Sequence, residues 1–171
     1  MTTTNPQLTS LASQHERILG ILDGLDEDQL RSSVLPSGWS CLGMVVHLRE
    51  ATRFWALEVM LDQHPTTPAA TDFDVPTDID ATNIISSYRA ETSRALSAVA
   101  DLPLDTAPAW WPNGQWGGWR LHTFQEVLLH LLIETACHAG HLDAARELID
   151  GATWDYATNR PTRHQAQGSS S

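Results

Sequence analysis

The chain has 171 residues, of which ten are Lys or Arg and 21 are Asp or Glu, so its formal net charge at pH 7 is −11. This length suits one domain with a sizeable core, since domains of about 150 residues bury about 70% of the surface that their unfolded chains expose. The negative charge argues against nucleic acids and anionic membranes as partners, and no apolar run reaches the length of a signal peptide or membrane span, so we expect a cytoplasmic protein.

The first predicted helix covers residues 6–23. Its apolar side chains recur at helical spacing, Pro6 suits the first turn, and Gly24 follows the last residue. Residues 25–39 are rich in Asp, Ser, Pro and Gly, so we expect an irregular connector there.

The second predicted helix runs from Cys41 to about Gln63. Ser40 supplies the N-cap, and Pro65 ends the helix because a residue that precedes proline disfavours the helical conformation. His47 lies in the first half of this helix, on the same face as apolar residues, so it should point into the protein. A single histidine in such a position is usually a hydrogen-bonded core residue.

Two long irregular segments enclose the third predicted helix, which covers residues 79–100. Residues 64–79 contain three prolines. Residues 102–120 place four tryptophans among prolines and glycines: Trp110, Trp111, Trp116 and Trp119. This aromatic segment is either a strap that seals one end of a bundle or a wall of a pocket, and we favour neither interpretation.

The fourth predicted helix, Thr123–Gly151, is the longest. Thr123 can cap its first turn while Glu126 reaches back to the amide of the cap residue, and Gly151 suits the residue that ends the helix. At ~100° per residue, four side chains that can bind metals share one arc of this helix: His130, Glu134, His138 and His141. Because apolar residues also fall in this arc, we expect the polar row to face the core: Val127, Leu131, Ala145 and Leu148.

A carboxylate and imidazoles in an apolar seam are costly unless they are paired or bind an ion. Glu134 and His138 are one helical turn apart and can reach one metal from the same side. A third ligand must come from another helix, and His47 is the candidate. Three protein ligands would leave a position of the metal open for water or a thiol.

The two cysteines, Cys41 and Cys137, are too few and too far apart for a paired-cysteine metal motif or a disulfide framework. We expect both to be small buried side chains. We place a single metal-binding helical domain at residues 1–158 and a flexible polar tail at residues 159–171.

Three stretches of the chain resemble the DinB-like four-helix metalloproteins: PSGWS at 36–40, VVHLREATRFW at 45–55 and HLLIETACHAGHLDAARELIDG at 130–151. The ExxxH spacing in the last helix is the most specific part. Within that superfamily the chain is most similar to the branch of mycothiol-dependent maleylpyruvate isomerase and the related mycothiol S-transferases. We therefore predict an all-α, up-and-down four-helix bundle with a metal at its mouth.

The resemblance implies that His47, Glu134 and His138 bind one divalent metal, with Zn²⁺ as the first choice and Ni²⁺, Mn²⁺ or Fe²⁺ as alternatives. It also implies that the metal activates a low-molecular-weight thiol, with mycothiol as the expected cosubstrate, for attack on an electrophilic small molecule. His141 and His130 are the candidate catalytic residues, which would orient a ligand or relay a proton.

Two other functions fit the same residues. The first alternative is a bundle that binds metal without catalysis, such as a stress-response protein, and a fourth ligand from His130 or His141 would favour it. The second is a non-haem iron enzyme, because two histidines and one carboxylate also form the iron triad of that class. A homodimer is allowed but no motif indicates it.

Overall fold

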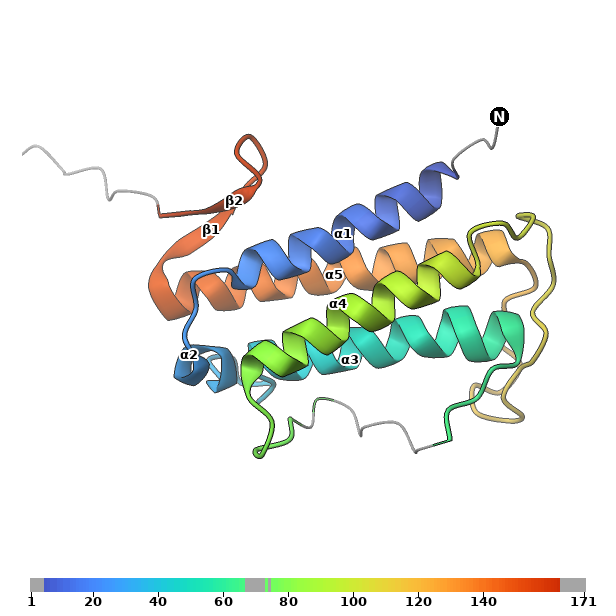
Figure 1. Ribbon diagram of the computed structural model, residues 1–171, viewed down its shortest axis with the longest axis horizontal. Helices are drawn as coiled ribbons and strands as arrows, with labels where there is room; N and C mark the ends of the chain where they lie inside the picture. The colour runs from blue at the N-terminus through green and yellow to red at the C-terminus, as the bar shows by residue number, and fades with distance from the viewer. Residues whose placement is uncertain (1–4, 67–72, 74, 164–171) are drawn as a thin grey trace, which may run out of the picture.

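The computed structural model describes residues 5–66, 73 and 75–163, which form a helical bundle with one short hairpin (Figure 1). The helices are α1 (Pro6–Leu22), α2 (Glu27–Arg31), α3 (Cys41–Arg53), the π-helix η1 (Phe54–Val59), α4 (Ala81–Ala98) and α5 (Phe124–Asp150). The strands β1 (Ala152–Asp155) and β2 (Arg160–Arg163) follow α5. The predicted all-α bundle is confirmed.

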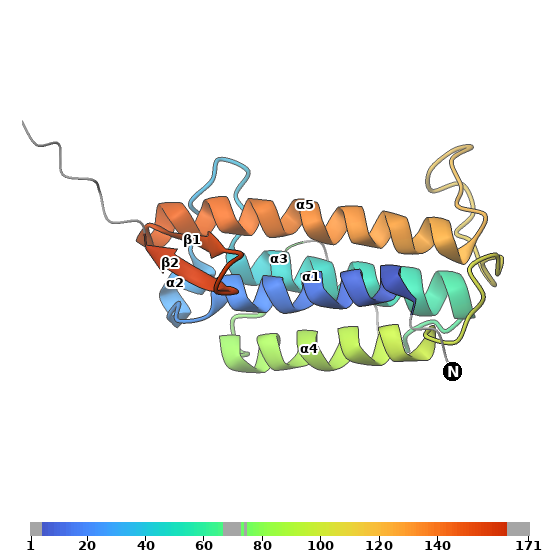
Figure 2. The ribbon, with the colours of Figure 1, turned by 90° about the horizontal axis from the view of Figure 1, so that it is seen from above.

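The four long helices lie side by side, with α1 next to α5 and α3 next to α4 (Figures 1 and 2). The chain path differs from a simple up-and-down order at one connection, because α3 and α4 run in the same direction (Figure 1). The N–H of Ala81, at the start of α4, donates to Glu27 of α2 at 2.9 Å. At the other end of the bundle, the N–H of Trp110 donates to the carbonyl of Val59 at 3.1 Å. The end of η1 and the start of α4 therefore lie at opposite ends of the bundle, which explains the length of the segment between them.

The caps of α5 agree with the prediction except in one detail. The Thr123 hydroxyl accepts from the N–H of Glu126 at 3.3 Å, and Gly151 ends the helix with φ at 77°. The Glu126 carboxylate accepts from the N–H of His122, one residue before the cap, and not from the cap amide that we predicted. The structure thus places both ends of α5 where the sequence indicates.

The second predicted helix is not α-helical throughout. Its α-helical part, α3, ends at Arg53, and η1 continues it as six residues of π-helix. Trp55 and Glu58 of this π-helix are both buried, with exposed fractions of 6% and 8%. Asp62, with φ at 56°, turns the chain away, so the predicted end near Gln63 is slightly late.

Two small elements were not predicted. The short helix α2 lies within the predicted connector and starts with a capping box between Asp26 and Gln29. Strands β1 and β2 pair antiparallel, with Ala152 opposite Arg163. Residues 160–163 therefore belong to a hairpin and not to the predicted flexible tail, and residues 164–171 of that tail lie outside the described residues.

The buried side chains form two clusters, one toward each end of the bundle. Arg146 of α5 is 5% exposed and links α5 to the end of α1 through hydrogen bonds. Its guanidinium donates to the carbonyls of Ile21 and Asp23 at 2.6 and 2.8 Å, and it also donates to Asp150 at 3.0 Å. These bonds satisfy carbonyls at the C-terminal end of α1 with a positive charge, which suits the helix dipole.

No helix among the described residues combines the length and the apolar character that a membrane span requires.

Candidate metal centre

The candidate site lies between α3 and α5. The Nε2 atom of His47, on α3, lies 3.2 Å from Oε1 of Glu134 on α5. The Nε2 atom of His138, one turn further along α5, lies 3.4 Å from the same carboxylate oxygen. Ligand atoms from the three residues all lie within 4.8 Å of one another. The structure thus brings together the three residues that we predicted as ligands.

These separations fit the geometry of a metal site. Ligand atoms at about 2.0–2.2 Å from a tetrahedral Zn²⁺ lie about 3.3–3.6 Å from one another. The two nitrogen–oxygen distances in the group, 3.2 and 3.4 Å, are close to that spacing. Imidazole nitrogens and a carboxylate oxygen are also the donors that zinc and other first-row divalent metals accept in proteins.

The Glu134 carboxylate is held in its charged form. Hydrogen bonds from His138 and then from His47 lower the pKa of Glu134 well below its usual range, and they outweigh the opposing effect of burial. The lowered pKa therefore favours the charged form of the Glu134 carboxylate. A charged carboxylate between two imidazoles is what a divalent cation requires from its ligands.

His141 contacts one of the three residues. Its Nδ1 atom lies 3.2 Å from Nδ1 of His138, so one ring donates a hydrogen bond to the other. The ring of His141 is exposed and lies 6.3 Å from the ring of Trp39. His141 is therefore placed where it can fix the orientation of His138 while it remains open to water.

His130 lies in a different environment, among aromatic rings. Its ring centroid is 4.6 Å from that of Trp55 and 5.6 Å from that of Trp119. Burial lowers the pKa of His130, and the charge of Glu134 opposes that shift in part. The neutral imidazole is thus favoured, next to the tryptophans of the 102–120 segment.

The polar row of α5 does not face the core as we predicted. His130, Glu134 and His138 are partly buried, whereas His141 is exposed and Leu148 is 61% exposed. The row lies at the edge of the α3–α5 contact, because the core side of α5 is filled by buried apolar residues: Val127, Leu128, Leu131, Ala139 and Leu142. This position leaves the three candidate ligands accessible from solvent.

The prediction for the cysteines is confirmed for Cys41 and wrong for Cys137. Cys41 is buried at the start of α3, whereas Cys137 is exposed. Cys137 lies about 100° around the helix from His138, which places it on the outer side of α5.

Sequence reasoning did not find the aromatic rings that adjoin the site. The ring of Phe73 stacks on that of His47, with centroids 4.7 Å apart and an interplanar angle of 16°. Trp39 lies next to His141. Both residues stand in segments without helical periodicity, so only their aromatic character could have marked them as candidates.

Comparison with protein families gives one result for this chain. A family model described as mycothiol-S-transferase matches residues 8–151, which include all five predicted site residues. A search of curated proteins finds no match.

Proposed function

The chain belongs to the mycothiol-S-transferase family, and we propose that it transfers a low-molecular-weight thiol, with mycothiol as the cosubstrate, to an electrophilic small molecule at a metal centre. The observation that carries the proposal is the convergence of His47, Glu134 and His138 on one point between α3 and α5. A cytoplasmic location remains our prediction from the sequence.

We assign the three residues as the ligands of a divalent metal, and Zn²⁺ fits the two nitrogens and one oxygen best. When bound, such a metal supplies a Lewis-acidic centre that lowers the pKa of a coordinated thiol. The charged Glu134 carboxylate offsets half of the metal's charge, and the two Nε2 atoms provide neutral donors. Ni²⁺, Mn²⁺ and Fe²⁺ are the alternatives that elemental analysis would identify.

His141 is the residue that we assign to proton movement. If His138 binds through Nε2, its proton lies on Nδ1 and is donated to Nδ1 of His141. The remaining proton of His141 then lies on Nε2, in an exposed ring. This arrangement fixes the tautomer of His138 and provides an exchangeable proton beside the centre.

His130 and Trp119 are the residues that we assign to the wall beside the electrophile. Trp119 is 45% exposed and its ring lies 5.6 Å from that of His130, one turn before Glu134. An exposed indole next to a largely neutral imidazole offers an apolar surface to a small organic substrate.

Two observations bear on the alternative functions. Among the described residues, the group that could hold a metal consists of three members, and neither His130 nor His141 joins it. A fourth protein ligand from these histidines would have favoured a purely structural metal, so the geometry favours an open position and catalysis. A non-haem iron enzyme would use the same two histidines and one carboxylate as ligands. Only the identity of the metal distinguishes that alternative from the thiol transferase.

The test is an assay of thiol consumption with a panel of alkyl and aryl halides. The proposal expects that the zinc-loaded protein consumes mycothiol with release of one halide per thiol and that His138→Ala abolishes the reaction. Cysteine and glutathione serve as comparison thiols, and the exposed-histidine variant His122→Ala serves as the control. Equal rates for wild type and His138→Ala would rule out catalysis at this centre.

A further inference from the structure

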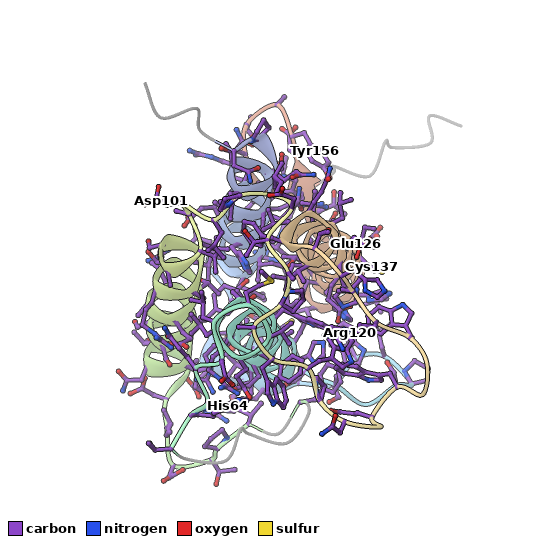
Figure 3. The ribbon with its side chains drawn as sticks, turned by 90° about the vertical axis from the view of Figure 1, so that its right-hand side faces the viewer. His64, Asp101, Arg120, Glu126, Cys137 and Tyr156 are labelled. Atoms are coloured by element: carbon purple, nitrogen blue, oxygen red, sulfur yellow. The ribbon has the colours of Figure 1, made fainter. Side chains whose placement is uncertain are left out.

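A cavity of about 550 Å³ lies on the outside of the bundle, between α1, α4 and the β1–β2 hairpin. Its lining includes residues from all three of these elements: Gln14, Arg17, Gly20, Arg89, Trp154 and Tyr156. Figure 3 shows Tyr156 on the side of the molecule opposite to α3, and the cavity shares no residue with the candidate metal centre. Its volume is in the range of small-molecule sites, which is about 300–1,000 Å³.

The hairpin wall of this cavity is fixed against the helices. A Cβ atom added at Gly20 would lie 2.5 Å from the ring of Trp154, so the indole packs directly on the backbone of α1. The N–H of Trp154 donates to Oδ1 of Asp143, on α5, at 2.6 Å. The cavity is therefore formed before any ligand binds, as small-molecule sites usually are.

Arg17 is the residue of the cavity that lacks adequate partners. Its side chain is only 13% exposed, yet its Nε atom is buried without a hydrogen-bond partner among the described residues. The nearest carboxylate oxygen, Oδ2 of Asp143, lies 3.9 Å from the guanidinium, which is too far for a hydrogen bond. The ring of Tyr156 lies 4.9 Å from the guanidinium carbon and covers its face, but hydrogen bonds are made in the guanidinium plane. A buried charged donor without a partner is costly, and a bound carboxylate would remove that cost.

The charged side chains that line the cavity cancel one another. Arg17 and Arg89 are opposed by Glu16 and Asp23. Gln14, one turn before Arg17 on α1, has its Oε1 atom buried without a partner among the described residues. One face of α1 thus offers an unpaired donor and an unpaired acceptor. A ligand with one carboxylate and one ammonium group matches this pattern and, having no net charge, is not repelled by the charge of −11 on the chain.

We propose that this cavity binds a free α-amino acid with an apolar side chain. The carboxylate of the ligand accepts from the guanidinium groups of Arg17 and Arg89, and its ammonium group donates to Oε1 of Gln14. The apolar side chain of the ligand lies against the rings of Trp154 and Tyr156. This site is separate from the metal centre and does not depend on the proposed thiol transfer.

Isothermal titration calorimetry of the full chain with L-phenylalanine tests the proposal. We expect saturable binding with a Kd below about 1 mM. Phenethylamine lacks the carboxylate and 3-phenylpropionate lacks the ammonium group, so each should bind at least about tenfold more weakly. The affinity for L-phenylalanine should stay the same when EDTA is added, whereas an amino acid that binds at the metal centre would lose its site.

Substitutions of arginine test the assigned contacts. Arg17→Met keeps an apolar chain of similar length without the charge, and it should weaken L-phenylalanine binding at least about tenfold. Arg89→Met changes an exposed side chain, so the fold should be kept, and it should weaken binding at least about threefold. Arg94→Met is the matched control on α4, because Arg94 pairs with Glu91 and does not line the cavity. It should bind L-phenylalanine like the wild type.

NMR spectroscopy of ¹⁵N-labelled protein locates the bound ligand. The indole N–H signal of Trp154, assigned by its absence in Trp154→Phe, should shift on addition of L-phenylalanine, whereas the signal of Trp119 should not. Four results would overturn the proposal: Kd values above about 1 mM for all apolar amino acids, equal affinity for either truncated analogue, wild-type affinity in both cavity variants, or loss of binding with EDTA. A shift of Trp119 in place of Trp154 would do so as well.

Discussion

At the scale of single residues, the first prediction concerns the contact between His138 and His141. If His138 binds the metal through Nε2, His141 accepts the hydrogen bond that holds the ring in place, so His141→Ala should lower metal affinity about 10–100-fold. His141→Asn keeps a hydrogen-bond acceptor, so its metal affinity should fall by less. Competition with a chromogenic chelator at pH 7 measures the affinity, with His122→Ala as the control. Wild-type affinity in His141→Ala would show that the contact does not orient the ligand.

A second residue-scale prediction concerns His15, which is 4% exposed in the core between α1, α3 and α4. The hydroxyl of Tyr88 lies 2.6 Å from its Nδ1, and Thr52 lies 3.5 Å from its Nε2. Burial lowers the pKa of His15 from 6.5 to about 4. Between these pH values the unfolded chain binds a proton that the folded chain does not. Stability contributed by the neutral ring is thus complete above pH 6.5 and falls by ~3 kcal/mol as the pH drops to 4.

Urea unfolding in the presence of a chelator, at pH 7.5 and pH 4.5, measures this effect. The loss of stability between the two pH values should be smaller in His15→Gln than in the wild type, because the glutamine binds no proton. His122→Gln, which changes an exposed histidine, should keep the wild-type loss. An equal loss in all three proteins would mean that His15 is protonated in the folded chain.

At the scale of secondary-structure elements, the contact of α1 with α5 depends on Arg146. Its side chain and that of Asp150 are each 7% exposed, and its guanidinium also binds two carbonyls at the end of α1. Arg146→Ala would leave these groups unpaired and should cost about 3–5 kcal/mol of unfolding free energy. Arg94→Ala removes an exposed ion pair with Glu91 and should cost less than about 1 kcal/mol. Similar losses in the two variants would contradict the assignment of Arg146 as the fastening residue.

The tryptophans of the 102–120 segment pack on η1 and on α5. The segment therefore has features of both a strap that seals the bundle and a wall of a pocket. The ring centroid of Trp55, in η1, lies 5.4 Å from that of Trp116 and 6.0 Å from that of Trp119. Trp116 is partly buried within this cluster, whereas Trp119 is 45% exposed beside His130. The inner part of the segment therefore covers the end of the bundle, and Trp119 is the part that we propose as a contact for the substrate.

Trp119→Ala should accordingly raise KM for an apolar electrophile several-fold while metal content and stability stay near the wild-type values. Trp55→Ala, in contrast, removes a ring that is 6% exposed and should cost about 3–5 kcal/mol of unfolding free energy. Steady-state kinetics and urea unfolding on both variants separate the two effects. An unchanged KM in Trp119→Ala would show that the 102–120 segment only seals the bundle and does not contact the substrate.

At the scale of the whole molecule, the sequence predicts the helices that have periodically spaced apolar residues or recognisable cap residues. Four long helices and the caps at Thr123 and Gly151 follow from apolar spacing and terminal residues. The three residues that converge at the site were predicted because Glu134 and His138 share a face and because His47 should point inward from another helix. The family resemblance implies the same three residues. The position of the site at the edge of the contact between α3 and α5 follows from side-chain packing, which spacing alone does not give.

Other features leave a weak signal or none in the sequence. The direction of α4 differs from the predicted up-and-down order, because a connection as long as 60–80 permits either direction. The π-helix η1 has no sequence signature, and α2 is too short for a periodic pattern, although its Asp26–Gln29 capping box was readable. Strand β2 contains Pro161, which argues against a strand unless it lies at an edge, as it does here.

The metal content of the purified chain tests the central claim most directly. Elemental analysis of wild type beside His138→Ala and Glu134→Gln, with Glu147→Gln as the control on α5, should find about one divalent metal per chain in wild type and control and a loss in both ligand variants. In Co²⁺-substituted wild type, mycothiol should change the visible spectrum of the metal. Full metal content in both ligand variants, or no metal in any of the four proteins, would contradict the assignment of His47, Glu134 and His138 as a metal centre.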